Sequence, residues 1–267
     1  MPNARNITCP INIHGIGRSG TTLLQNIIGR VPYVQTCNET AGLVFCCYKA
    51  GESALLSSDT DNHIAPQELP PVLVRSALCT AMASSKEKWS QKLGGIPNQI
   101  VWPNISADDL DYAAEPYPFP YSWYWEALRQ TFPHSTDILI IRNYRDVIIS
   151  RNYHSGWDPR GIAQSIAIYY NLMAHPAANI THYIYFSDLI SRPPELVPEI
   201  FQAIQLIYSE QVLKAFDDYC SASGRRTLTQ GRASDFGWDD KYPEMLTPDL
   251  DRIITPALRR LEEKYPR

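Results

Sequence analysis

The chain has 267 residues, 44% of them hydrophobic, which is enough for one large domain with a substantial core. Its net charge of −4 argues against a general nucleic-acid surface, because phosphate backbones bind basic faces, although a single basic pocket is compatible with this charge. No apolar run approaches the length of a membrane span. The first strand is expected from near Ile7, which leaves no room for a secretory signal, so the expected location is cytoplasmic unless targeting residues have been removed.

The cysteines show neither CxxC nor histidine-linked spacing, so no metal site is predicted. Cys46 and Cys47 are adjacent and are poorly placed to pair with each other. Free, mostly buried thiols are therefore expected at the six positions, which are Cys9, Cys37, Cys46, Cys47, Cys79 and Cys220.

A glycine-rich stretch, Gly15 to Thr22, lies between an apolar run at 11–13 and a helical pattern at 23–28. This order predicts a strand, a turn and a helix. Glycines let the backbone turn sharply and point successive N–H groups inward, and the helix start adds the positive end of its dipole. The stretch is therefore a candidate phosphate or sulfate site. The simpler alternative is an ordinary glycine turn between a strand and a helix.

The spacing from Gly15 to Gly20 matches a nucleotide P-loop, but the position of the P-loop lysine holds Thr21, and a cation stands three residues earlier at Arg18. An NTPase uses that lysine and Mg²⁺ to neutralise a highly charged transferring group. A sulfuryl group carries less charge, so Arg18, the backbone N–H groups and the hydroxyls of Thr21 and Thr22 can suffice for it.

Helical and extended patterns alternate along the rest of the chain. The first helix is expected to end between Gly29 and Pro32. Residues 92–124 give no regular pattern because of their prolines and glycines, and about 57–121 is expected to form a substrate-side cap and loops. The alternation predicts one α/β domain over residues 1–267, with a parallel sheet, helices on both faces and a P-loop-like nucleotide-binding core. Strands are expected at about 33–36, 137–141 and 183–186, and helices at about 41–57, 68–85, 122–132, 146–150, 159–173, 194–207, 210–219 and 247–264.

A second strand-to-helix corner follows the buried strand at 137–141. Arg142 stands at the strand end and Ser150 lies along the following helix, whose first turn carries Asp146. A guanidinium supplies paired donors and a hydroxyl supplies a third, so Arg142 and Ser150 can converge on one anion. The alternative is a strand-end arginine that pairs with Asp146.

Together the two corners, Gly-x-x-Arg-Ser-Gly-Thr-Thr-Leu-Leu and Arg-Asn-x-Arg-Asp-x-x-x-Ser, resemble the two signatures of sulfotransferases that use 3′-phosphoadenosine-5′-phosphosulfate (PAPS). The pattern is most similar to the tyrosylprotein and bacterial-type members. The resemblance implies that Arg142 and Ser150 bind the 3′-phosphate. It also implies a set of ligands for the 5′-phosphosulfate, namely Gly17, Arg18, Ser19, Gly20, Thr21 and Thr22.

The resemblance extends to three further positions. Glu39 resembles the acidic residue that acts as general base on the acceptor, while the alternative is a glutamate favoured by the dipole of the next helix. Phe186, in Phe-Ser-Asp-Leu, stands where the family has a tyrosine near the adenine. Arg232 resembles a 3′-phosphate ligand of a loop that closes over the nucleotide, with a solvated arginine as the alternative.

The family also offers a lysine or histidine between the two motifs, and the comparable place, Ala114-Glu115-Pro116, holds neither. Five side chains are candidates to supply this charge, with Arg18 and the loop amides as the alternative; the five are His63, Lys86, Lys88, Lys92 and His134.

The expected function is transfer of a sulfuryl group from PAPS to a hydroxyl or amine of a small-molecule, glycan or peptide acceptor, with Glu39 as base and Arg18 beside the breaking bond. No nucleic acid or membrane partner is expected, and the sequence leaves the acceptor and the oligomeric state open. The rival functions are a kinase or NTPase that has replaced its lysine, and a non-catalytic nucleotide-binding module.

Overall fold

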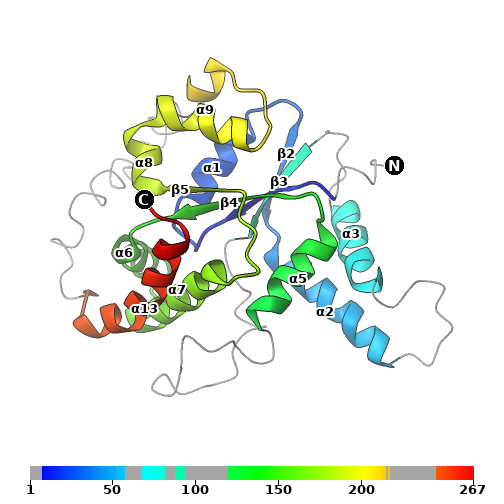
Figure 1. Ribbon diagram of the computed structural model, residues 1–267, viewed down its shortest axis with the longest axis horizontal. Coiled ribbons are helices and arrows are strands. Elements are labelled where there is room, and N and C mark those ends of the chain that lie inside the picture. Colours follow the sequence, from blue (N-terminus) through cyan, green and yellow to red (C-terminus); the bar gives the residue numbers. More distant parts are fainter. Residues whose placement is uncertain (1–7, 58–67, 82–87, 94–119, 215, 217–244) are drawn as a thin grey trace.

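The computed structural model describes residues 8–57, 68–81, 88–93, 120–214, 216 and 245–267. Within these ranges one five-stranded sheet has the order β2-β3-β1-β4-β5, and all neighbouring strands are parallel (Figure 1). The strands are β1 (Ile11–His14), β2 (Val34–Glu39), β3 (Lys88–Leu93), β4 (Thr136–Ile141) and β5 (His182–Tyr185). The predicted parallel sheet is confirmed.

Helices cover both faces of the sheet, as predicted (Figure 1). One face carries α1 (Thr21–Ile28), α8 (Phe186–Ser191) and α9 (Pro193–Ala203). The other face carries α2 (Ala41–Ser57), α3 (Leu69–Ala81), α5 (Tyr121–Thr131), α6 (Tyr144–Ser155), α7 (Pro159–Ala174) and α13 (Pro248–Lys264). β4 shows why both layers form, because Ile138 and Ile140 belong to the first core whereas Leu139 and Ile141 belong to the second.

β3 is the strand that the sequence pattern did not predict, and it lies inside the stretch 57–121 that was expected to hold a cap and loops. It pairs with β1 on one side and β2 on the other. Its polar residues Ser90, Gln91 and Lys92 are buried, so its sequence lacks the apolar run that marks a central parallel strand. Hydrogen-bond partners on neighbouring elements, described below, compensate for the burial of Gln91 and Lys92.

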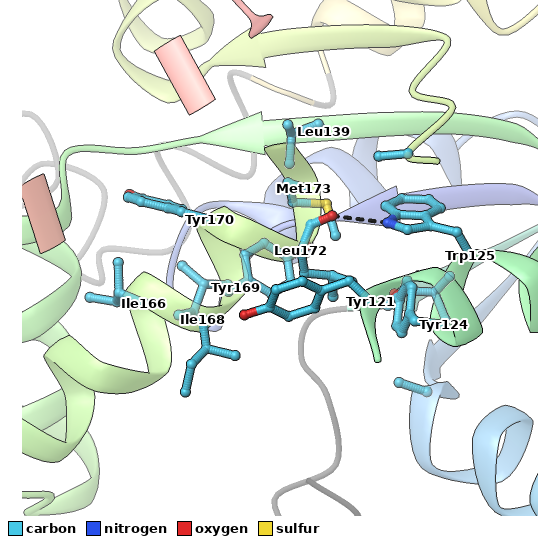
Figure 2. Packing of buried hydrophobic residues seen from close by; sticks show 14 of the residues in the cluster. Tyr121, Tyr124, Trp125, Leu139, Ile166, Ile168, Tyr169, Tyr170, Leu172 and Met173 are labelled. Atoms are coloured by element: carbon cyan, nitrogen blue, oxygen red, sulfur yellow. Dashed lines mark hydrogen bonds between the residues drawn. The ribbon is translucent and has the colours of Figure 1, made fainter. Parts of the chain in front are cut away.

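Aromatic rings fill the core between α5 and α7 (Figure 2). Tyr124 and Trp125 of α5 lie 4% and 5% exposed, and their rings meet edge to face at 5.2 Å. The indole N–H of Trp125 donates to the carbonyl oxygen of Leu172 in α7 at 2.9 Å, drawn as a dashed line in Figure 2. Packing therefore accounts for these rings.

The cysteines that the structure describes are free thiols, as predicted, but the expectation that most are buried is wrong for them. Cys9 and Cys46 are exposed, and Cys37, Cys47 and Cys79 are half-buried. Cys220 lies outside the described residues. None of the helices in the described ranges combines the length and the apolar composition that a membrane crossing requires.

Candidate active site

The ends of the parallel strands bring the candidate residues to one edge of the sheet. The glycine loop follows β1, Glu39 ends β2, Lys92 is the penultimate residue of β3, and Arg142 follows β4. Phe186 follows β5 as the first residue of α8. Because all five strands are parallel, these carboxyl ends face the same side, which is where open α/β sheets bind ligands.

The glycine loop has a constrained backbone. Arg18 and Gly20 have positive φ angles of 76° and 104°, and the N–H of Ser19 donates to the carbonyl oxygen of Ile16 at 2.9 Å. A Cβ atom on Gly20 would lie 2.5 Å from the ring of Phe186, so only glycine fits both the angle and the space. α1 begins directly afterwards at Thr21, and its first N–H groups lack partners within the helix. This geometry suits an anion.

Lys92 supplies a cation to this loop. Its side chain is 10% exposed, and its ammonium group donates to the hydroxyl oxygen of Thr22 at 3.2 Å. The same nitrogen lies 3.9 Å from Oε1 of Glu39. The cation that a P-loop carries in its own sequence therefore comes here from a neighbouring strand.

The other candidates for this charge lie elsewhere. Lys88 begins β3 at its opposite end, where its ammonium group donates to the carbonyl oxygen of Gln205 at 3.0 Å. His134 is exposed and precedes β4, at the amino edge of the sheet. His63, Lys86 and the stretch 114–116 lie outside the described residues.

Glu39 is the last residue of β2 and pairs in register with Lys92, after an irregularity between Cys37 and Glu39. Its side chain is 63% exposed, so the carboxylate is open to solvent. α2 begins two residues later at Ala41 and has no acidic residue in its first turn. The carboxylate therefore lies next to Lys92, whose ammonium group also contacts the loop.

Arg142 and Ser150 converge on Arg18. A terminal nitrogen of Arg142 donates to the backbone oxygen of Arg18 at 3.1 Å, and Nε of Arg18 donates to the hydroxyl oxygen of Ser150 at 3.1 Å. Arg142 also lies 3.6 Å from a carboxylate oxygen of Asp146. The pairing with Asp146 that was an alternative to anion binding thus coexists with contacts to the loop.

Phe186 is 2% exposed and packs against the glycine loop at Gly20. The guanidinium group of Arg142 lies 4.5 Å from the centre of its ring, and the ring fills the space next to Gly20. The structure therefore gives this residue a packing role between the two motifs, and its expected place near the adenine stays a prediction. Arg232 lies outside the described residues.

Sequence reasoning did not identify Arg151, which follows Ser150 on α6. Its guanidinium group lies 4.6 Å from the centre of the Trp157 ring, and the indole is 40% exposed. Burial lowers the pKa of Arg151, and the negative charge of Glu39 opposes this shift. Arg151 therefore adds positive charge on the Glu39 side of the site, and no spacing pattern in the sequence singled it out.

The donor set fits a nucleotide with two anionic ends. Lys92 joins the glycine loop through Thr22, and Arg18, Arg142 and Ser150 form a second cluster. The hydroxyl oxygen of Ser19 is buried without a hydrogen-bond partner among the described residues, as expected of a group that awaits a ligand.

A cavity of about 1050 Å³ adjoins Arg142 between α8, α13 and the end of β5. Tyr144, Tyr185, Glu262 and Arg267 are part of its lining. Neither the glycine loop nor Glu39 nor Lys92 lines it, so the reacting atoms are expected outside this cavity.

A parallel α/β sheet with a cation-lined glycine loop at its carboxyl edge defines a class of proteins that bind phosphate or sulfate esters. Comparison with protein families is more specific, because residues 10–210 match the model of the Sulfotransferase family. The chain therefore belongs to this family.

Solved structures similar to this chain are also sulfotransferases. The sulfotransferase domain of the Synechococcus PCC 7002 olefin synthase is 16% identical, with 80% of this chain and 77% of that chain covered and a TM-score of 0.47. A sulfotransferase from Alicyclobacillus acidocaldarius is 12% identical, with 96% and 95% covered and a TM-score of 0.48. No curated protein sequence matched the chain.

Proposed function

We propose that this protein transfers a sulfuryl group from PAPS to a hydroxyl or amine of an acceptor. The observation that carries the proposal is the position of Lys92, whose ammonium group contacts Thr22 of the loop and lies 3.9 Å from Glu39. On this proposal Lys92 serves the leaving phosphate and Glu39 serves the acceptor proton, so the two groups would flank the sulfur of a bound donor from the leaving side and the attacking side.

The chemistry divides between these residues. The acceptor oxygen or nitrogen forms a bond to sulfur while the bond from sulfur to the bridging phosphate oxygen breaks. Glu39 takes the proton of the acceptor as general base. Lys92 and the loop N–H groups stabilise the negative charge that develops on the leaving phosphate oxygen.

We assign Arg18 a different role from the one expected from its sequence position. Its guanidinium group is directed to Ser150, whereas Lys92 is the cation beside Glu39. We therefore assign Lys92 to the breaking bond, and Arg18, Arg142 and Ser150 to the 3′-phosphate end of the donor. Gly17, Ser19, Gly20, Thr21 and Thr22 hold the 5′-phosphosulfate end.

Calorimetry with the wild-type protein tests the donor. We expect 3′,5′-adenosine bisphosphate to bind at least about tenfold more tightly than 5′-AMP, because a phosphate paired with arginine contributes more than about 1.4 kcal/mol. ATP with Mg²⁺ is measured for comparison, because it is the ligand that a kinase or NTPase would bind. Tighter binding of ATP with Mg²⁺, or equal binding of the bisphosphate and 5′-AMP, would contradict the proposed donor.

Labelled PAPS and a panel of hydroxyl and amine acceptors test the reaction. Transfer of label to any acceptor supports an enzyme. Bisphosphate binding without transfer to any member of the panel would favour the rival non-catalytic nucleotide-binding module.

A further inference from the structure

A row of buried polar side chains crosses the sheet beneath the active-site edge. Asp137 of β4 and Gln91 of β3 both align with Asn12 of β1, and the three residues are 7%, 0% and 0% exposed. The side-chain amide of Asn12 donates to Oδ1 of Asp137 at 3.0 Å, and that of Gln91 donates to Oδ1 of Asn12 at 2.7 Å. The row ends at Thr40, whose hydroxyl donates to Oε1 of Gln91.

Asp137 sets the direction of these hydrogen bonds. An ionised carboxylate only accepts, so Asn12 must present its NH₂ group to Asp137 and its carbonyl oxygen to Gln91. Gln91 then presents its NH₂ group to Asn12 and its carbonyl oxygen to Thr40, which must donate. Ser135 and His14 hold the carboxylate in place, each at 2.6 Å. Each bond polarises the next in a buried chain of this kind.

Thr40 joins this row to the two proposed catalytic residues. It follows Glu39 directly, and its backbone N–H donates to the carbonyl oxygen of Lys92 at 3.2 Å. The β2–β3 pairing is irregular between Cys37 and Glu39, so regular strand pairing alone does not fix the corner that Glu39 and Thr40 form at the end of β2. The hydroxyl and the N–H of Thr40 therefore both attach the end of β2 to β3.

We propose that this row of hydrogen bonds, from Asp137 through Asn12 and Gln91 to Thr40, positions Glu39 and Lys92 relative to each other for catalysis. It is called the relay below, although no proton is transferred along it. The inference rests on the proposed function of these two residues. Thr40 and Gln91 are positioning residues, because they touch neither the loop anion site nor, on this proposal, the reacting atoms. Misplacement of catalytic groups by about 1 Å can reduce turnover by about 10²-fold, so even a partial loosening of the corner should be measurable.

Thr40→Val and Thr40→Ser form a matched pair, because valine keeps the shape and loses the hydroxyl whereas serine keeps the hydroxyl. We expect Thr40→Val to lower kcat by about tenfold, with the Kd of the bisphosphate within about twofold of wild type. Thr40→Ser should retain most of the wild-type kcat. Tyr48→Phe is the control on α2, because it removes a hydrogen bond of 2.7 Å to Gln130 that lies outside the relay, and its kcat should be unchanged.

Hydrogen exchange of the amide at position 40 gives a second readout that does not depend on activity. We expect exchange of this amide to accelerate in Thr40→Val but not in Thr40→Ser or Tyr48→Phe. Wild-type kcat in Thr40→Val, or unchanged exchange at position 40, would overturn the relay. A wild-type protein that transfers no sulfuryl group would instead overturn the proposed function, and the exchange data alone would then decide whether the relay holds the corner.

Discussion

At the scale of single residues, the contacts of Lys92 support the role proposed for it. A buried ammonium group is stable only with compensating partners, and Lys92 has two oxygen atoms from different elements, one on Thr22 and one on Glu39. Lys88 on the same strand has the same chemistry but lies at the amino edge of the sheet, so position alone separates the two lysines.

Replacement of Lys92 by methionine tests this role, because methionine keeps most of the volume and removes the charge. We expect Lys92→Met to lower kcat by about 10²-fold in a sulfate-transfer assay, since one preorganised electrostatic contact to the leaving group is lost. Lys88→Met is the matched control and should leave kcat unchanged. Equal effects of the two substitutions would reject the assignment of Lys92.

Glu39 is tested by Glu39→Ala. We expect turnover to fall by about two orders of magnitude or more, because the acceptor loses its general base, while the Kd of the bisphosphate stays nearly constant. Calorimetry and steady-state kinetics on the same preparation separate the two effects. Unchanged turnover would remove Glu39 from the mechanism.

At the scale of elements, the glycine loop and Phe186 form one unit. The loop backbone at Gly20 lies against the Phe186 ring, and Arg142 covers that ring with its guanidinium group. The two sequence motifs are thus joined through the Phe186 ring, which packs against Gly20 and makes a cation–π contact with Arg142, as well as by the hydrogen bond from Arg142 to Arg18.

Gly20→Ala should disrupt this unit. A methyl group at Gly20 meets the Phe186 ring and also disfavours the φ angle of 104°, so we expect a loss of about 1–3 kcal/mol in the free energy of unfolding. Gly42→Ala in α2 is the control, because nothing lies within 4 Å of its added Cβ, and it should be neutral or stabilising. Denaturant unfolding measures both, and equal stabilities would contradict the close contact at Gly20.

At the scale of the whole molecule, two helical layers hold the sheet, and α13 joins the end of the chain to α7. Lys264 of α13 donates to the carbonyl oxygens of His175 and Ala178, at 2.6 and 3.0 Å, just after α7. The loop and the strand ends can keep a fixed geometry because this surrounding core is buried on both faces of the sheet.

Stability should fall in mild acid because of His182 in β5. Burial lowers the pKa of His182 below its ordinary value of 6.5, and the Glu199 carboxylate opposes this only in part. The unfolded chain therefore binds the proton first as the pH falls. The stabilisation of the folded state by neutral, buried His182 is thus complete above pH 6.5 and is lost below it. His182→Gln should reduce the loss of unfolding free energy between about pH 8 and about pH 5, measured by denaturant titration. An identical pH profile in His182→Gln and wild type would contradict this.

The central part of the fold could be predicted from local signals. The apolar run at 137–141 fits a strand buried on both faces, and the glycine spacing before Thr21 marks a turn into a helix. β3 could not be predicted in this way, because its buried residues Ser90, Gln91 and Lys92 are polar. The side-chain partners of Gln91 and Lys92 lie on β1, β2 and α1.

The sequence by itself determined the glycine loop between β1 and α1, the second motif at Arg142 and Ser150, and the parallel α/β class, since each depends on residues that are neighbours along the chain. Only the tertiary structure decided which cation serves the loop, because Lys92 follows Thr22 by 70 residues and reaches it through the order of the strands. It also decided that Phe186 supports the loop. Pairing between distant strands, rather than local propensity, selects these contacts.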